Sequence, residues 1–152
     1  MREDIADRFE IDALRGEFTD AATQGDFDRF EALFTEDARL AIPDARVDFR
    51  GRATIRAGIE RLREVWEFLI QHAHPGTIRV DGDTATGRSY VHEVGRFTDG
   101  RSHVNYAIYH DEYRRTPDGW KFAARVYQVL YLDETPLTGS APAVSGTVMP
   151  VR

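Results

Sequence analysis

The sequence contains no cysteine, which excludes disulfide bonds, thiolate nucleophiles and cysteine-ligated metal sites. No lysine or arginine cluster alternates with aromatic residues, and the formal net charge is −6, so we expect no nucleic-acid partner. No apolar run could span a bilayer, and the N-terminal segment does not resemble a signal peptide. We therefore expect a cytoplasmic protein without a membrane partner.

Motifs for metals and cofactors are missing as well. The sequence has no H-E-x-x-H spacing, no glycine-rich phosphate loop and no recognisable Ser-His-Asp order. It therefore predicts neither a metal ion nor a cofactor, and any catalysis would use acid and base side chains. Histidine exchanges a proton near neutral pH most readily, so histidines are the first candidates.

The length and composition fit one globular domain. A chain of 152 residues with 41% hydrophobic content can bury a core without staples. We expect the domain to span residues 1–135, followed by a tail over 136–152. The tail is rich in turn residues and small apolar residues and carries almost no charge. Its composition leaves open whether it lies ordered on the surface or is loose.

Helical periodicity characterises the first half. An apolar stripe through Phe9, Leu14, Phe18 and Ala21 predicts a first helix over 5–22. The other expected elements are a second helix capped by Asp26 with Phe27, Phe30, Leu33 and Phe34 on its buried face, a third helix over 53–71 that ends before Pro75-Gly76, and short strands over 38–42 and 45–49.

The second half consists of predicted strands separated by Asp-Gly turns. These turns join consecutive strands into hairpins, which predicts an antiparallel meander. Helices followed by strands indicate an α+β fold, with the helices packed on one face of a bent sheet. The expected strands cover 77–80, 84–97, 102–115 and 120–132.

Several short motifs occur in a characteristic order. They are Gly25-Asp26-Phe27-Asp28, then Leu33 to Ala38, Phe49-Arg50-Gly51, His72 ahead of Ile78 to Ala85, and Asp118-Gly119-Trp120 leading to Arg125. With this order and spacing, the chain resembles the SnoaL-like branch of the nuclear transport factor 2-like superfamily over about 11–133. The resemblance implies a cone-shaped, curved, mostly antiparallel sheet closed by three N-terminal helices.

The dehydratases and dehydrochlorinases of that branch pair an aspartate near the end of the first helix with a histidine after the third. The resemblance places the histidine at His72, with His74 as the alternative, and puts Thr23 at the aspartate position. A threonine can hydrogen-bond an imidazole but cannot neutralise its charge, so the dyad is incomplete. We expect the His72 imidazole to face the cavity near Thr23.

Strand alternation completes the expected pocket, because residues two apart share a face. By resemblance, Arg125 and Tyr127, Asn105 and Tyr109, and Glu93 point into the cone. Arg125 is then a natural counter-charge for Glu93, in either a functional or a purely structural ion pair. The expected catalytic residues are His72, Glu93 and Arg125, and the expected substrate-binding residues are Thr23, His74, Asn105, Tyr109 and Tyr127.

The opposite face of the sheet would be broadly apolar. Monomers rarely expose that much contiguous apolar surface, so we expect a homo-oligomer, and the resemblance favours a trimer over a dimer. The residues expected on this face are Val104, Tyr106, Ile108, Phe122, Val126 and Leu130.

Two functions remain open at this point. A cofactor-independent lyase or isomerase would apply dehydratase-like or cyclase-like acid–base chemistry to a small hydrophobic cyclic molecule bound in the cone. Alternatively, the cone holds a ligand or stabilises a partner without catalysis, because this fold carries both kinds of protein. A solvent-exposed His72 would favour the second function.

Overall fold

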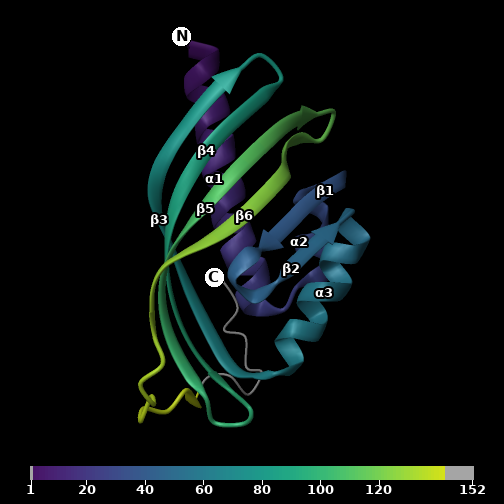
Figure 1. The fold of residues 1–152 in the computed structure, drawn as a ribbon. Coiled ribbons are helices and arrows are strands. Elements are labelled where there is room, and N and C mark those ends of the chain that lie inside the picture. Colours follow the sequence, from purple (N-terminus) through teal and green to yellow (C-terminus); the bar gives the residue numbers. More distant parts are fainter. Residues whose placement is uncertain (1, 143–152) are drawn as a thin grey trace.

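The computed structural model describes residues 2–142, which form three α-helices and one six-stranded, curved, unclosed sheet (Figure 1). Helices precede the long strands, so the fold is α+β as the sequence predicts. The elements are α1 (Arg2–Gln24), α2 (Phe27–Ala32), β1 (Phe34–Ile42), the 3-10 turn η1 (Pro43–Ala45), β2 (Val47–Arg50), α3 (Arg52–Glu64), β3 (Trp66–Asp81), β4 (Thr84–Phe97), β5 (Ser102–Thr116) and β6 (Gly119–Asp133).

The sheet is mixed but mostly antiparallel. Its strand order is β2-β1-β6-β5-β4-β3, and β1 and β6 form a parallel pair whereas the other neighbours are antiparallel. The four long strands β3 to β6 form the predicted meander, and the helices pack against its concave face. This face therefore carries the core, and the convex face is turned away from the helices.

Helix α1 covers the concave face through a stripe of residues three or four apart. Ile11, Leu14, Phe18 and Ala21 are all buried. Phe9, which we expected on this stripe, is 76% exposed because it lies five residues from Leu14 and on another side of the helix. The predicted cap of α2 is confirmed, since the Asp26 carboxylate accepts a hydrogen bond from the Arg29 amide at 3.2 Å.

The predicted third helix is wrong at its C-terminal end. Helix α3 ends at Glu64, and the run from Trp66 onward is strand β3, paired with β4 along its length. The sequence V-W-E-F-L-I suits a strand because it is rich in β-branched and aromatic residues. Pro75 lies at a register shift in this edge strand, where its missing amide is tolerated. Gly76 is required there because a Cβ would lie 1.8 Å from the Arg88 carbonyl oxygen.

Strand β6 contains a bulge that changes the predicted facing of one aromatic residue. We expected Phe122 on the convex face, yet it is fully buried in the concave core, where its ring packs 5.7 Å from that of Phe18. The register shift opposite Glu112 and Tyr113 explains this, since an extra residue in one strand reverses the alternation beyond it.

The tail is described only in part. After β6 ends at Asp133, the Leu137 amide donates to the Ser102 hydroxyl at 3.1 Å, and Arg96 donates to the carbonyls of Leu137 and Gly139. The remaining predicted tail, 143–152, lies outside the described residues. None of the described helices combines the length and apolar character needed to cross a membrane.

Candidate active site

Five of the residues expected in the pocket lie on the concave face of the meander. Glu93, Asn105, Tyr109, Arg125 and Tyr127 come from β4, β5 and β6, and each is at most 9% exposed. The strand alternation that we used to place them is therefore correct. Their roles in binding or catalysis stay a prediction.

The expected histidine and its threonine partner are placed differently. His72 lies on β3 directly opposite His92 of β4, and it is exposed, as are His74 and Thr23. The expectation that His72 faces the cavity near Thr23 is therefore wrong. The physical reason is that residue 72 lies in a strand and not at a helix end, so Gln71 takes the inward direction and His72 the outward one.

The concave face instead brings together Glu93, His103 and Gln71. The His103 Nε2 lies 2.9 Å from Glu93 Oε1, and Gln71 Nε2 donates to Glu93 Oε2, also at 2.9 Å. Glu93 and His103 are buried, on the two strands of the β4–β5 hairpin. A carboxylate and an imidazole in contact can share and transfer one proton, which makes this pair a candidate base.

Sequence reasoning missed both His103 and Gln71. His103 is two residues before Asn105 on the same strand, so strand alternation alone could have found it. Gln71 could not be found in this way, because we had assigned it to a helix.

Aromatic rings form one wall around the imidazole. The Trp66 ring stacks on Phe97 with centroids 3.8 Å apart and meets the His103 ring edge-on at 4.8 Å. The Glu93–His103 pair is buried, and a low local dielectric strengthens its electrostatic interactions.

Two polar atoms beside this pair lack a partner. Asn105 Oδ1 and the Tyr127 hydroxyl are buried, and neither atom makes a well-formed hydrogen bond with the described residues, although the Asn105 amide lies near the Tyr127 phenol. Burial raises the pKa of the Tyr127 phenol, and the Glu93 and Tyr109 side chains raise it further, against a smaller opposing effect of the Asn105 amide. Tyr127 is therefore protonated at physiological pH and can donate a hydrogen bond. An unpaired buried polar group costs about 1–3 kcal/mol, which a ligand could recover.

Tyr109 completes this wall. Its hydroxyl accepts a hydrogen bond from Gln71 Nε2 at 3.2 Å, and its ring meets that of Tyr127 edge-on at 5.1 Å. Burial raises the pKa of the Tyr109 phenol, although the nearby Arg125 charge acts in the opposite direction. One glutamine amide thus links Tyr109 to Glu93.

The predicted pairing of Glu93 with Arg125 is not made. The Arg125 guanidinium binds both carboxylate oxygens of Asp111 at 2.8 and 3.0 Å and lies 3.8 Å from the Tyr109 ring centroid. Burial disfavours the Arg125 charge, but Asp111 outweighs burial, and the pKa of Arg125 is raised. The reason is register, since Arg125 lies opposite Asp111 whereas Glu93 lies opposite Asn105.

The described surface also has two hollows of about 560 and 690 Å³. Neither is lined by Glu93 or His103. Within residues 2–142, no group of three or more histidine, aspartate or glutamate side chains is arranged to hold a metal ion.

Comparison with known proteins matches residues 3–126 to the SnoaL-like domain family. An uncharacterised protein of Mycobacterium tuberculosis is 31% identical over 133 residues, covering 81% of this chain and 85% of that protein. The crystal structure of a proposed aromatic ring hydroxylase from Novosphingobium aromaticivorans superimposes with a TM-score of 0.79 at 29% identity, covering 86% of this chain and 94% of that chain.

Two further structures share the fold at lower identity. A type 2 hexachlorocyclohexane dehydrochlorinase has a TM-score of 0.81 at 22% identity, covering 91% of this chain and 96% of that chain. A proposed scytalone dehydratase from Novosphingobium aromaticivorans has a TM-score of 0.79 at 20% identity, covering 94% and 97%. These two likenesses show that the fold is one that lyase-type enzymes use. The domain match over residues 3–126 establishes that the chain belongs to the SnoaL-like domain family.

Proposed function

We propose that the protein is a cofactor-independent lyase or isomerase that acts on a small hydrophobic cyclic molecule bearing an oxygen substituent. The observation that supports this function is the buried Glu93–His103 pair next to two buried polar atoms without partners, on Asn105 and Tyr127. A base beside vacant hydrogen-bonding positions is an arrangement suited to proton abstraction next to a carbonyl group.

The proposed chemistry begins with removal of a proton from the carbon next to the carbonyl by the Glu93–His103 pair. The electron pair of that C–H bond forms a C=C bond while the carbonyl π pair moves onto the oxygen, which Tyr127 stabilises by donating a hydrogen bond. When Tyr127 passes its proton to this oxygen, the enol hydroxyl donates to Asn105 Oδ1, and Tyr127 recovers the proton when the carbonyl forms again. Return of the proton to another carbon completes an isomerisation, whereas loss of a substituent with its electron pair completes an elimination.

The hydrophobic and cyclic character of the substrate is inferred from the walls of the site. Trp66, Phe97, Tyr109 and Tyr127 present flat rings around the polar atoms. Such walls favour a planar or cyclic ligand, with few polar groups to set its orientation. The name of one structural neighbour, a proposed aromatic ring hydroxylase, agrees with a ring-shaped ligand.

Exchange of deuterium from D2O into 2-tetralone, followed by proton NMR, tests the proposal. This ketone has activated hydrogens next to its carbonyl group, so exchange reports proton abstraction without knowledge of the natural substrate. We expect the native protein to catalyse the exchange and Glu93→Gln to lower the rate by about 10²–10⁴-fold, the usual contribution of a general base. His103→Gln should have an effect of similar size.

The matched control is His72→Ala, which removes an exposed imidazole from the other face of the same sheet. Its exchange rate should remain within about twofold of the native rate, since surface substitutions perturb the fold little. A large loss in His72→Ala with an unchanged Glu93→Gln would contradict the proposal. Circular dichroism and a melting curve establish that each variant is folded.

A second function is supported by the exposure of His72 and Thr23. Without the expected dyad, the concave site can serve as a binding module that holds a cyclic ligand but transfers no proton. In that case 2-tetralone or its enol analogue 2-naphthol would bind, and Glu93→Gln would change the affinity while neither protein catalysed exchange.

A further inference from the structure

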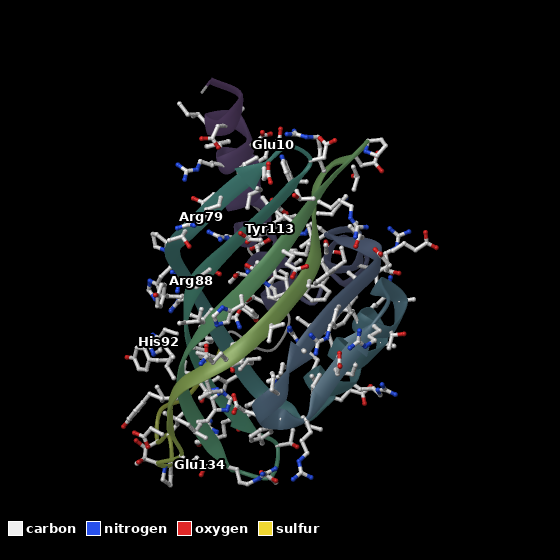
Figure 2. The ribbon with its side chains drawn as sticks, turned by 45° about the horizontal axis from the view of Figure 1, so that its top comes forward. Glu10, Arg79, Arg88, His92, Tyr113 and Glu134 are labelled. Carbon is white, nitrogen blue, oxygen red and sulfur yellow. The ribbon has the colours of Figure 1, made fainter. Side chains whose placement is uncertain are left out.

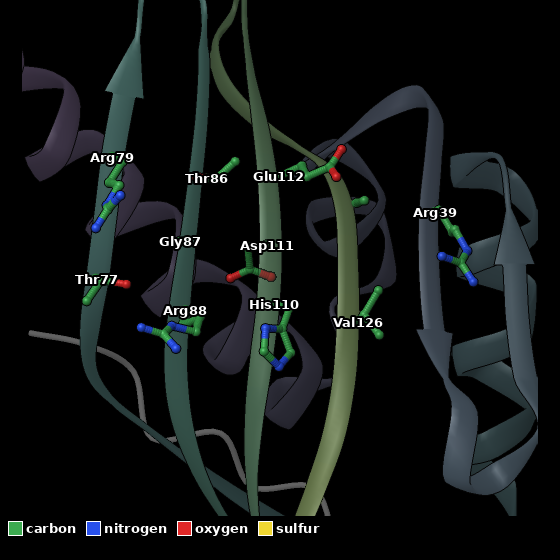
Figure 3. A pocket seen from close by; sticks show the side chains of 11 residues that line it. Arg39, Thr77, Arg79, Thr86, Gly87, Arg88, His110, Asp111, Glu112 and Val126 are labelled. Carbon is green, nitrogen blue, oxygen red and sulfur yellow. The ribbon is translucent and has the colours of Figure 1, made fainter.

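The convex face carries a hollow of about 560 Å³ that the proposed function does not use (Figure 3). The residues that lie opposite one another on neighbouring strands explain how the hollow forms. Short side chains line it, namely Thr77, Thr86, Ala124 and Val126, and the His110 and Glu112 residues of the middle strand β5 lie between those of β4 and β6. Small residues among long ones leave a depression in a sheet surface whose side chains stand roughly perpendicular to it.

Two arginines of this hollow have no acidic partner. Arg79 of β3 and Arg88 of β4 are exposed, and neither side chain forms an ion pair or hydrogen bond with the residues that the structure describes. They are diagonal neighbours, because Arg79 lies opposite Thr86 and Arg88 opposite Thr77. Figure 3 shows them on adjacent strands with Thr77 close by, and Figure 2 shows both projecting from the side of the sheet that also carries His92.

These two arginines differ from the third arginine of the hollow. The formal net charge is −6, and Arg39, on the far side of the same hollow, is held by the Asp48 carboxylate at 2.8 Å. Like charges on neighbouring strands repel one another, so Arg79 and Arg88 destabilise the sheet slightly unless an anion lies between them. Two carboxylate residues line the hollow. Asp111 has a buried side chain that binds Arg125, and Glu112 lies opposite Thr86 and acts electrostatically on Arg39.

We propose that this hollow binds the anionic group, phosphate or carboxylate, of a small molecule. Guanidinium forks at Arg79 and Arg88 match the geometry of either group in a bidentate manner. The hydroxyls of Thr77 and Thr86 add donors between them, and the His110 ring, held by Gln128 at 2.7 Å, borders the site. The apolar side chains of Ala124 and Val126 supply contact for an uncharged part of the ligand.

The proposal is independent of the function of the concave face. The strands that form the hollow separate it from Glu93 and His103, because side chains on alternate positions point to opposite faces. Loss of the anion site should therefore leave deuterium exchange unchanged. The converse should also hold, since Glu93→Gln removes nothing from the convex face.

Calorimetric titration with phenyl phosphate, phthalate and benzyl alcohol tests the site. We expect at least one of the two anions to bind, with an affinity that falls as salt is added, and the neutral alcohol not to bind. The relative affinities of phenyl phosphate and phthalate decide between phosphate and carboxylate. In the variant Arg79→Gln/Arg88→Gln the affinity should fall by about tenfold or more, the equivalent of one charge-assisted hydrogen bond.

The control is Arg46→Gln/Arg61→Gln, which removes the same charge from exposed arginines outside the hollow. It should retain the native affinity within about threefold. An equal loss in both double variants would reduce the effect to net charge and overturn the site. So would equal binding of benzyl alcohol, or amide NMR shifts on phenyl phosphate addition that fall away from β3, β4 and β5.

Discussion

The concave and convex faces of one sheet carry contrasting chemistry, although their residues alternate along the same strands. On the concave face, Glu93, Asp111 and Arg125 are buried, and each is paired with a side chain of a neighbouring element or strand. On the convex face, His92 stacks on Tyr106 with 7° between the rings, and Arg79 and Arg88 meet solvent. The difference shows that alternation, more than residue type, decides what a side chain can do here.

The tyrosines show the same division. Tyr109, Tyr113 and Tyr127 are buried in the concave core, whereas Tyr90, Tyr106 and Tyr131 are exposed on the convex side. Four of the five histidines lie on the convex face or its edge, and only His103 is buried. The number of histidines on each face would therefore place the proton-transfer site on the convex face, which is the wrong one.

The largest effect on stability is expected from breaking a concave ion pair. Asp111→Ala removes the partner of the fully buried Arg125 and should lower the free energy of unfolding by about 3–5 kcal/mol, measured by urea titration. On the convex face, Glu112→Gln should change it by no more than about 0.5 kcal/mol. Equal effects at these adjacent positions would contradict the contrast between the faces.

A double substitution sharpens this test. Replacing both partners, Asp111→Leu with Arg125→Met, should recover much of the loss, because the Arg125 charge is then removed together with its partner. A double variant as unstable as Asp111→Ala would indicate that packing, and not charge pairing, holds this part of the core.

The next effect concerns alkaline pH. Burial raises the pKa of the Tyr109, Tyr113 and Tyr127 phenols above the value of 10 that they have when unfolded. The folded state keeps these protons longer than the unfolded state. The three groups therefore contribute stability that is present below about pH 10 and is lost as the pH rises further.

Absorbance at 295 nm during an alkaline titration measures this effect. The concave tyrosines should ionise together with unfolding, as a late and cooperative step. Tyr127→Phe should reduce the amplitude of that step, whereas Tyr106→Phe on the convex face should leave it unchanged. A late step that Tyr106→Phe reduces equally would contradict the assignment.

Substitutions in the apolar part of the convex face should have the smallest effect on the fold, but they should change the assembly. We propose that other copies of the chain cover it, with a trimer favoured over a dimer. Tyr106→Asp should leave the melting temperature nearly unchanged and give a monomer in sedimentation equilibrium. A native protein that stays monomeric at micromolar concentration would contradict this assembly. The exposed members of this surface are Ile70, Tyr90, Tyr106, Leu130 and Tyr131.

Sequence reasoning succeeded where a strand runs without interruption. Asp-Gly turns located the hairpins, and alternation placed Glu93, Asn105 and Tyr109 on the buried face. It failed where a strand contains an extra residue, because the position of such a bulge depends on how the strand pairs with its neighbour. The extra residue in β6 turns Phe122 inward, while Arg125 lies opposite Asp111 as unbroken alternation from that end of the strand predicts.

The error at His72 has a different cause. Residues 66–71 are apolar enough to continue the period of α3, and local periodicity cannot distinguish that helix from a strand. The long outer edge of β4 decides the matter, because β3 satisfies its backbone hydrogen bonds through pairing from Trp66 to Asp81. This interaction is remote in sequence, and it exchanges His72 for Gln71 at the site.

A crystal structure of the protein soaked with 2-naphthol, the aromatic analogue of the 2-tetralone enol, tests most directly whether the concave face is the functional one. We expect the naphthol ring to lie against Tyr109 and Tyr127, with its hydroxyl within hydrogen-bonding distance of Asn105 Oδ1 and the Tyr127 hydroxyl. Density for the ligand beside His72 on the convex face, with Asn105 and Tyr127 still unpaired, would contradict it.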